Sequence, residues 1–100
     1  MVEEKGMLVT DMDPDELFEA YSNPEVQACV IEWVANLKGY ERFDDEAFLT
    51  EAVATAARLK ELLPFDEVML DGRRDKSPSA IIMVTALHLL ELGLIPPYEK

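Results

Sequence analysis

The sequence has few of the residues that build disulfides and metal centres. It contains one cysteine, Cys29, and one histidine, His88. A single cysteine excludes a disulfide within the chain. A structural zinc site needs four ligands, and a di-iron site in a helical bundle needs two Glu-x-x-His pairs, so the sequence supplies neither set. We therefore expect no metal and no cofactor.

Basic residues are also scarce. The 100 residues include 9 Lys and Arg against 21 Asp and Glu, which gives a formal net charge of -12. Proteins that bind the nucleic-acid backbone gain affinity by neutralising phosphates with Lys and Arg. The composition therefore argues against direct binding of nucleic acid. The charge is unevenly distributed, because successive quarters of the chain carry -7, -3, -2 and 0.

Long hydrophobic runs are missing as well. The longest, residues 80–87, is interrupted by Thr85 and followed by His88 and Glu91, whereas a membrane-spanning helix needs about 20 apolar residues. The first residues, Met-Val-Glu-Glu-Lys, are acidic, where a secretory leader would be basic. We expect a cytoplasmic protein with no membrane insertion.

The sequence does have enough apolar residues for a core. Hydrophobic residues make up 49% of the chain, far more than a disordered chain of high net charge contains. A chain of 100 residues is expected to fold as one domain. We therefore expect a single helical domain over residues 1–100, with residues 1–5 and 97–100 flexible.

Start and stop signals predict four helices. Three begin with a capping residue followed by proline, and the other is marked by apolar residues at helical spacing. The first begins at Asp13, and the others span residues 23–39, 44–63 and 78–92. Gly39 marks the end of the second helix, because glycine accepts the left-handed cap conformation. The predicted fold is an all-α compact bundle of four main helices.

Two further segments have the pattern of short strands. Residues 6–10 and 67–71 are candidates for a minor two-stranded β-ribbon. The second segment also fits one more helical turn, because Phe65, Val68 and Met69 have helical spacing. Both interpretations stay open.

The fourth predicted helix is apolar on almost every side. Its polar stripe is limited to Ser77, His88 and Glu91. In a small protein, such a helix is either the centre of the bundle or half of a subunit interface. The candidate interface residues are Ile81, Ile82, Val84, Leu89, Leu92 and Ile95.

Three aspartates near the start alternate as the first ligands of a calcium-binding loop do. The pattern, Asp11, Asp13 and Asp15, then fails. The sixth loop position is Glu16, where the sharp turn needs glycine, and the twelfth is Ser22, where a bidentate glutamate is needed. Capping of the first helix explains these carboxylates better.

The single histidine and the single cysteine each have a structural explanation. His88 and Glu91 share one helical face, but no nucleophile or orienting group is marked beside them, so a hydrogen-bonded pair on the helix surface is preferred. Cys29 lies at the edge of the apolar stripe of the second helix, where a small buried residue is preferred to a reactive thiol. Because no catalytic motif is present, we expect that the protein is not an enzyme.

The loop before the fourth helix concentrates positive charge. Its bases precede a helix N-terminus, where free N–H groups can hold a phosphate or a carboxylate. The candidate anion-binding residues are Arg73, Arg74, Lys76, Ser77 and Ser79. Asp71 and Asp75 reduce the net charge of the loop to +1. A solvated loop whose arginines pair with the protein's own acids is therefore the preferred interpretation.

Acidic side chains gather on the first two predicted helices. Carboxylates one helical turn apart stand about 5 to 6 Å from each other, which is not far from the spacing of phosphates. The candidate residues for an acidic partner face are Glu16, Glu19, Glu25 and Glu32. An acidic face more often serves solubility.

These exclusions lead to three hypotheses for function. The leading one is a non-catalytic regulatory or accessory subunit that self-associates, as a homodimer, through the fourth helix or docks that helix on a larger protein. The first alternative is an acidic inhibitor that mimics nucleic acid and fills a basic groove of its partner. The second alternative is a protein that binds a small anionic ligand at residues 73–79.

Overall fold

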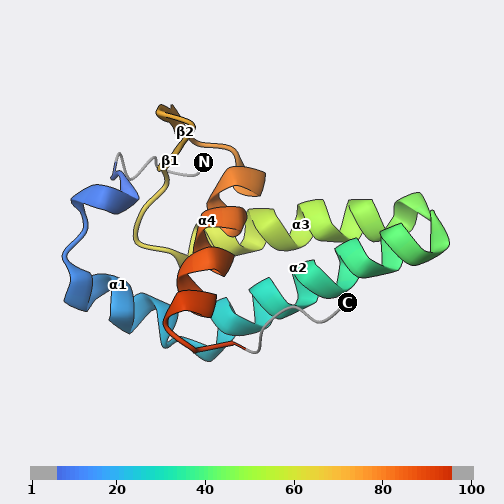
Figure 1. The fold of residues 1–100 in the computed structure, drawn as a ribbon, viewed down its shortest axis with the longest axis horizontal. Coiled ribbons are helices and arrows are strands. Elements are labelled where there is room, and N and C mark those ends of the chain that lie inside the picture. The colour runs from blue at the N-terminus through green and yellow to red at the C-terminus, as the bar shows by residue number, and fades with distance from the viewer. Residues whose placement is uncertain (1–6, 96–100) are drawn as a thin grey trace.

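The computed structural model describes residues 7–95 and confirms the expected fold, a bundle of four main helices with a minor β-ribbon. Two long antiparallel helices, α2 and α3, form the base, and α4 crosses them near one end (Figure 1). The termini expected to be flexible, residues 1–5 and 97–100, lie outside the described range. The elements are a 3-10 helix η1 (Val9–Asp11), α1 (Pro14–Tyr21), α2 (Pro24–Phe43), α3 (Glu46–Leu62), β1 (Val68–Leu70), β2 (Arg73–Asp75) and α4 (Pro78–Glu91).

Side-chain caps start all four α-helices. Each capping side chain accepts a hydrogen bond from a backbone N–H in the first turn, which satisfies one of the donors that a helix start leaves unpaired. In three of them proline follows the cap directly, as the sequence predicts. The capping residues are Asp13, Asn23, Asp45 and Ser77.

The second helix is longer than its sequence signal indicates. It continues past Gly39 to Phe43, so the prediction that Gly39 ends it is wrong. Gly39 instead lies against the ring of Phe48 in α3, and a Cβ atom built on it would stand 2.5 Å from that ring. The chain reverses at Asp44, which has a left-handed φ of 52° and caps the helix through its N–H. Glycine is needed at position 39 because α2 and α3 pack closely at this point.

The β-ribbon forms from different partners than expected. β1 pairs with β2 in an antiparallel hairpin, so the strand predicted over residues 67–71 is present, but its main partner is β2 rather than residues 6–10. The tip is Asp71-Gly72, both with positive φ, as a tight two-residue turn requires. The N-terminal segment contributes one parallel bridge, between Leu8 and Glu67. After Leu8 the chain forms η1 instead of a strand, because the Asp11 N–H donates to the Leu8 carbonyl.

α4 is the central helix of the core. Its buried residues belong to one hydrophobic cluster with side chains of α1, α2, α3 and β1. The predicted interface therefore needs a correction, because most of its residues already contact their own chain. Five of them are buried, namely Ile81, Ile82, Val84, Leu89 and Ile95, and Leu92 is half exposed. Within residues 7–95, no helix is both long and apolar enough to cross a membrane.

One buried hydroxyl in α4 has no hydrogen-bond partner among the described residues. Thr85 is fully buried and its Oγ1 atom is unpaired. A buried polar group without a partner costs about 1–3 kcal/mol. We therefore expect that Thr85→Val, which keeps the shape and removes the hydroxyl, raises the free energy of unfolding by about 1 kcal/mol. Urea unfolding followed by circular dichroism measures this change.

Thr55 in α3 provides a matched control for this prediction. It is also buried, but its hydroxyl donates to the Glu51 carbonyl at 2.8 Å. Thr55→Val removes a hydrogen bond that exists, so it should lower the free energy of unfolding by about 0.5 kcal/mol. A shift of both variants in the same direction would contradict the prediction.

Candidate functional site

A pocket of about 460 Å³ lies between α1 and the C-terminal end of α4. Its position follows from the fold, because the short α1 packs beside the last turns of the central helix (Figure 1). Apolar side chains form most of its wall, and acidic side chains lie among them. The lining residues include Asp15, Leu17, Phe18 and Tyr21 from α1, and His88, Glu91 and Leu92 from the end of α4.

Tyr21 and His88 form the polar centre of this pocket. The Tyr21 hydroxyl and His88 Nδ1 are 2.7 Å apart, and the Tyr21 ring packs edge-on against Phe65. Burial raises the pKa of Tyr21 far above its usual value of 10.0, so the phenol stays protonated at neutral pH. A protonated phenol can donate to an imidazole nitrogen or accept from its N–H group, so the tautomer of His88 sets the direction of this hydrogen bond.

This contact corrects the interpretation of His88 from the sequence. The expected partner of His88 was Glu91, but its Nδ1 atom bonds to Tyr21, which lies 67 residues away in the chain. Glu91 still lines the same pocket. No local pattern reveals a contact over such a distance. Sequence reasoning also missed Phe18. The only local signal for its exposure is that Leu17 and Tyr21 already supply the buried side of a helix only eight residues long.

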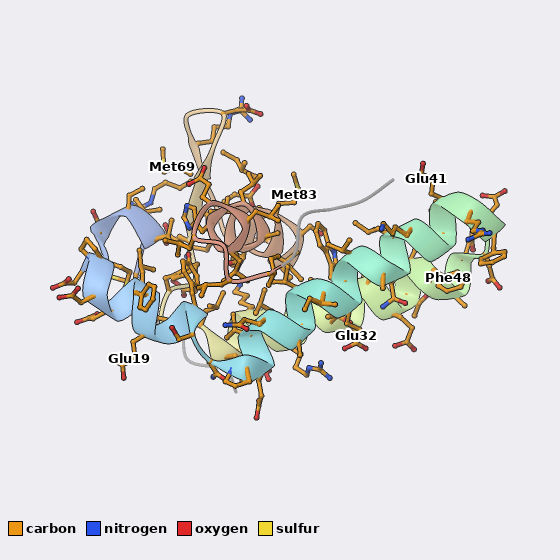
Figure 2. The ribbon with its side chains drawn as sticks, turned by 60° about the horizontal axis from the view of Figure 1, so that its bottom comes forward. Glu19, Glu32, Glu41, Phe48, Met69 and Met83 are labelled. Atoms are coloured by element: carbon orange, nitrogen blue, oxygen red, sulfur yellow. The ribbon has the colours of Figure 1, made fainter. Side chains whose placement is uncertain are left out.

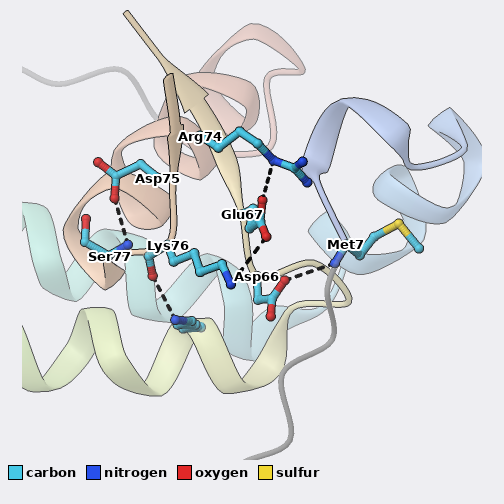
Figure 3. Close-up of polar contacts among 8 residues, drawn as sticks. Met7, Asp66, Glu67, Arg74, Asp75, Lys76 and Ser77 are labelled. Atoms are coloured by element: carbon cyan, nitrogen blue, oxygen red, sulfur yellow. Dashed lines mark hydrogen bonds and ion pairs between the residues drawn. The ribbon is translucent and has the colours of Figure 1, made fainter. Parts of the chain in front are cut away.

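Two bases of the predicted anion loop are held by a buried carboxylate. Arg74 Nε lies 2.6 Å from Glu67 Oε2, and Lys76 Nζ lies 3.6 Å from Glu67 Oε1 (Figure 3). The Glu67 side chain is only 8% exposed, so the ion pairs satisfy a charge that burial would otherwise penalise. This arrangement favours the interpretation in which the loop pairs with the protein's own acids.

The start of α4 is also occupied by the chain itself. Ser77 Oγ accepts a hydrogen bond from Ala80 N–H. The Asp75 carboxylate accepts one from Ser77 N–H (Figure 3), and hydrogen bonds from the backbone and side chain of Ser77 lower the Asp75 pKa. A carboxylate at this position repels a bound anion. Arg73 and Ser79 are exposed.

The four glutamates of the predicted acidic face are all exposed. Figure 2 shows Glu19 and Glu32 directed to the same side of the molecule. Glu32 is paired with Arg58 at 3.0 Å. The same guanidinium group contacts the sulfur of Cys29 at 3.4 Å, and Cys29 itself is buried. An acidic surface is thus present, with one of its four charges partly neutralised.

Metal ligands do not cluster in the part of the chain that the structure describes. Among residues 7–95, no three His, Cys, Asp or Glu side chains lie close enough together to hold a metal ion. Comparisons with protein families, with curated proteins and with solved structures gave no match to this chain. The candidate sites on the surface of the chain are the α1–α4 pocket and the exposed apolar side chains of α4, Met83, Leu87 and Leu90.

Proposed function

We propose that the protein is a small non-catalytic interaction module that acts in the cytoplasm as a regulatory or accessory subunit and self-associates through α4. The observation that carries the proposal is a line of exposed apolar side chains on this otherwise central helix. Met83, Leu87 and Leu90 are between 36% and 57% exposed. Their spacing of four and three residues places them on one side of the helix. We call them the α4 stripe.

Electrostatics favour a second copy of the chain at this stripe. Two copies with a net charge of -12 each repel one another, and the repulsion is smallest where few charges lie within a Debye length of about 8 Å. Glu91 is the only charged residue of α4. Met69 and Met83 are directed away from the side that carries Glu19 and Glu32 (Figure 2). A two-fold contact would place the stripe against itself.

Leu87→Glu tests this proposal, because it puts a charge in the middle of the stripe at a position that is 57% exposed and so should leave the fold intact. We expect sedimentation equilibrium to show a dimer for the wild type at micromolar concentration and a monomer for Leu87→Glu. Higher salt should tighten the dimer, because it screens the repulsion between the copies.

Val53→Glu is the matched control. Val53 is an equally exposed apolar residue on α3, outside the stripe, so this variant should remain a dimer. A wild type that is monomeric at micromolar concentration, or a Val53→Glu variant that dissociates as Leu87→Glu does, would overturn the proposal.

A further inference from the structure

We propose that the α1–α4 pocket binds a basic, apolar segment of a partner protein. The inference rests on the proposed function as an interaction module but uses a different surface. His88 and Glu91 line the pocket, and none of the α4 stripe residues does. Glu91 lies one helical turn from Leu87, so the two surfaces adjoin but share no residue. The two surfaces can therefore be disrupted separately.

The pocket presents apolar side chains to the solvent. Phe18 is 51% exposed and Leu92 is 48% exposed, and both are part of the wall. Its volume of about 460 Å³ lies in the range of roughly 300–1,000 Å³ that is typical of ligand pockets. Exposed apolar side chains in a concave site of this size fit an apolar anchor residue from a partner.

The charge around the pocket selects the class of partner. The two helices that form it, α1 and α4, carry four acids and no lysine or arginine. Two of the acids, Asp15 and Glu91, line the pocket itself. A groove of one charge sign attracts a ligand of the opposite sign and repels others. The charge therefore disfavours a second copy of this chain, with its -12, and favours a segment with lysine or arginine beside its apolar anchor.

His88 adds a polar group that can orient a bound segment inside the pocket. Because the Tyr21 hydroxyl already bonds to Nδ1, Nε2 is the ring nitrogen left for a ligand. A peptide segment can match Nε2 in either tautomer, because its backbone offers both N–H donors and carbonyl acceptors. Packing of Tyr21 against Phe65 fixes the imidazole before the partner arrives, which reduces the entropy cost of binding.

The test uses the full chain and a synthetic amphipathic peptide in which leucine and lysine alternate with helical spacing. We expect isothermal titration calorimetry to show saturable binding that weakens as salt is added. A peptide in which glutamate replaces each lysine should not bind. Phe18→Ser, at a half-exposed position, should weaken binding about tenfold or more, as expected for loss of an anchor contact.

Two pairs of charge-neutralising substitutions separate the pocket from the general acidity of the protein. Asp15→Asn with Glu91→Gln removes two charges at the pocket and should also weaken binding about tenfold. Glu41→Gln with Glu51→Gln removes two exposed charges on the α2–α3 pair. This pair should change the affinity for the peptide less than about twofold. Equal loss in both pairs, or unchanged binding by Phe18→Ser, would overturn the proposal.

Self-association distinguishes this inference from the proposed function. The monomeric Leu87→Glu variant should still bind the leucine–lysine peptide, because the α4 stripe lies outside the pocket. If a dimeric wild type does not bind the peptide, the pocket assignment fails and the proposed function stands. If Phe18→Ser dissociates the dimer, a second copy occupies the pocket and the assignment is also wrong.

Discussion

Replacing Tyr21 with phenylalanine is expected to destabilise the protein at neutral pH and to stabilise it in strong alkali. At neutral pH the variant loses the 2.7 Å hydrogen bond to His88. The loss should lower the free energy of unfolding by about 1 kcal/mol, the usual net value of one such bond. The penalty stays near this value because His88 is partly exposed, so water can replace the lost partner.

The effect changes sign in alkali because burial raises the pKa of Tyr21 in the folded protein. The unfolded chain ionises its tyrosines near pH 10, so the stability linked to the Tyr21 proton is fully present below about pH 10 and is lost as pH rises above it. The wild type should lose about 1.4 kcal/mol per pH unit relative to Tyr21→Phe. The two stability curves should therefore cross at about pH 11.

Urea unfolding at a series of pH values measures both curves. All other titratable side chains are common to the two proteins, so the difference between the curves isolates residue 21. A difference that stays constant from neutral to alkaline pH would show that the phenol is not held protonated by burial.

The features predicted correctly from the sequence are those set by neighbouring residues. The pairs Asp13-Pro14, Asn23-Pro24 and Ser77-Pro78 each start a helix, because the cap and the proline act on the first turn alone. The same locality explains the error at Gly39. Its cap signal is real, but a contact with Phe48 across the helix pair fixes Gly39 inside α2.

The candidate site was predictable only in part for the same reason. His88, Glu91 and Leu92 could be singled out as polar or apolar residues at the end of one helix, but their pocket needs α1, which the chain brings there from the other end of the sequence. The burial of α4 was similarly open, since an all-round apolar helix fits a core and an interface equally well. Three-dimensional packing places most of this helix in the core. Of its large apolar side chains, only the α4 stripe and Leu92 stay exposed.

Replacing Glu67 with glutamine is expected to lower the free energy of unfolding by about 2 kcal/mol, which corresponds to a fall in Tm of about 10 °C for a domain of this size. The substitution keeps the shape of a buried side chain and removes the charge that Arg74 and Lys76 neutralise. The backbone of Glu67 also bonds to Met7 and Val9, so loosening this residue weakens the contact between the N-terminal segment and the ribbon. The Arg74 side chain is 58% exposed and regains water, which keeps the cost below that of a fully buried pair.

Glu32→Gln supplies the comparison, since it breaks an ion pair whose two side chains are both about half exposed. It should cost less than about 0.5 kcal/mol, as exposed pairs usually do. In a double-mutant cycle, Arg74→Gln should cost about 1 kcal/mol in the wild type and much less beside Glu67→Gln, because the partner carboxylate is then absent. Thermal unfolding of the four proteins measures the coupling. Equal costs for Glu67→Gln and Glu32→Gln would mean that Glu67 holds Arg74 and Lys76 only weakly. The loop of residues 73–79 would then again be a candidate anion-binding site.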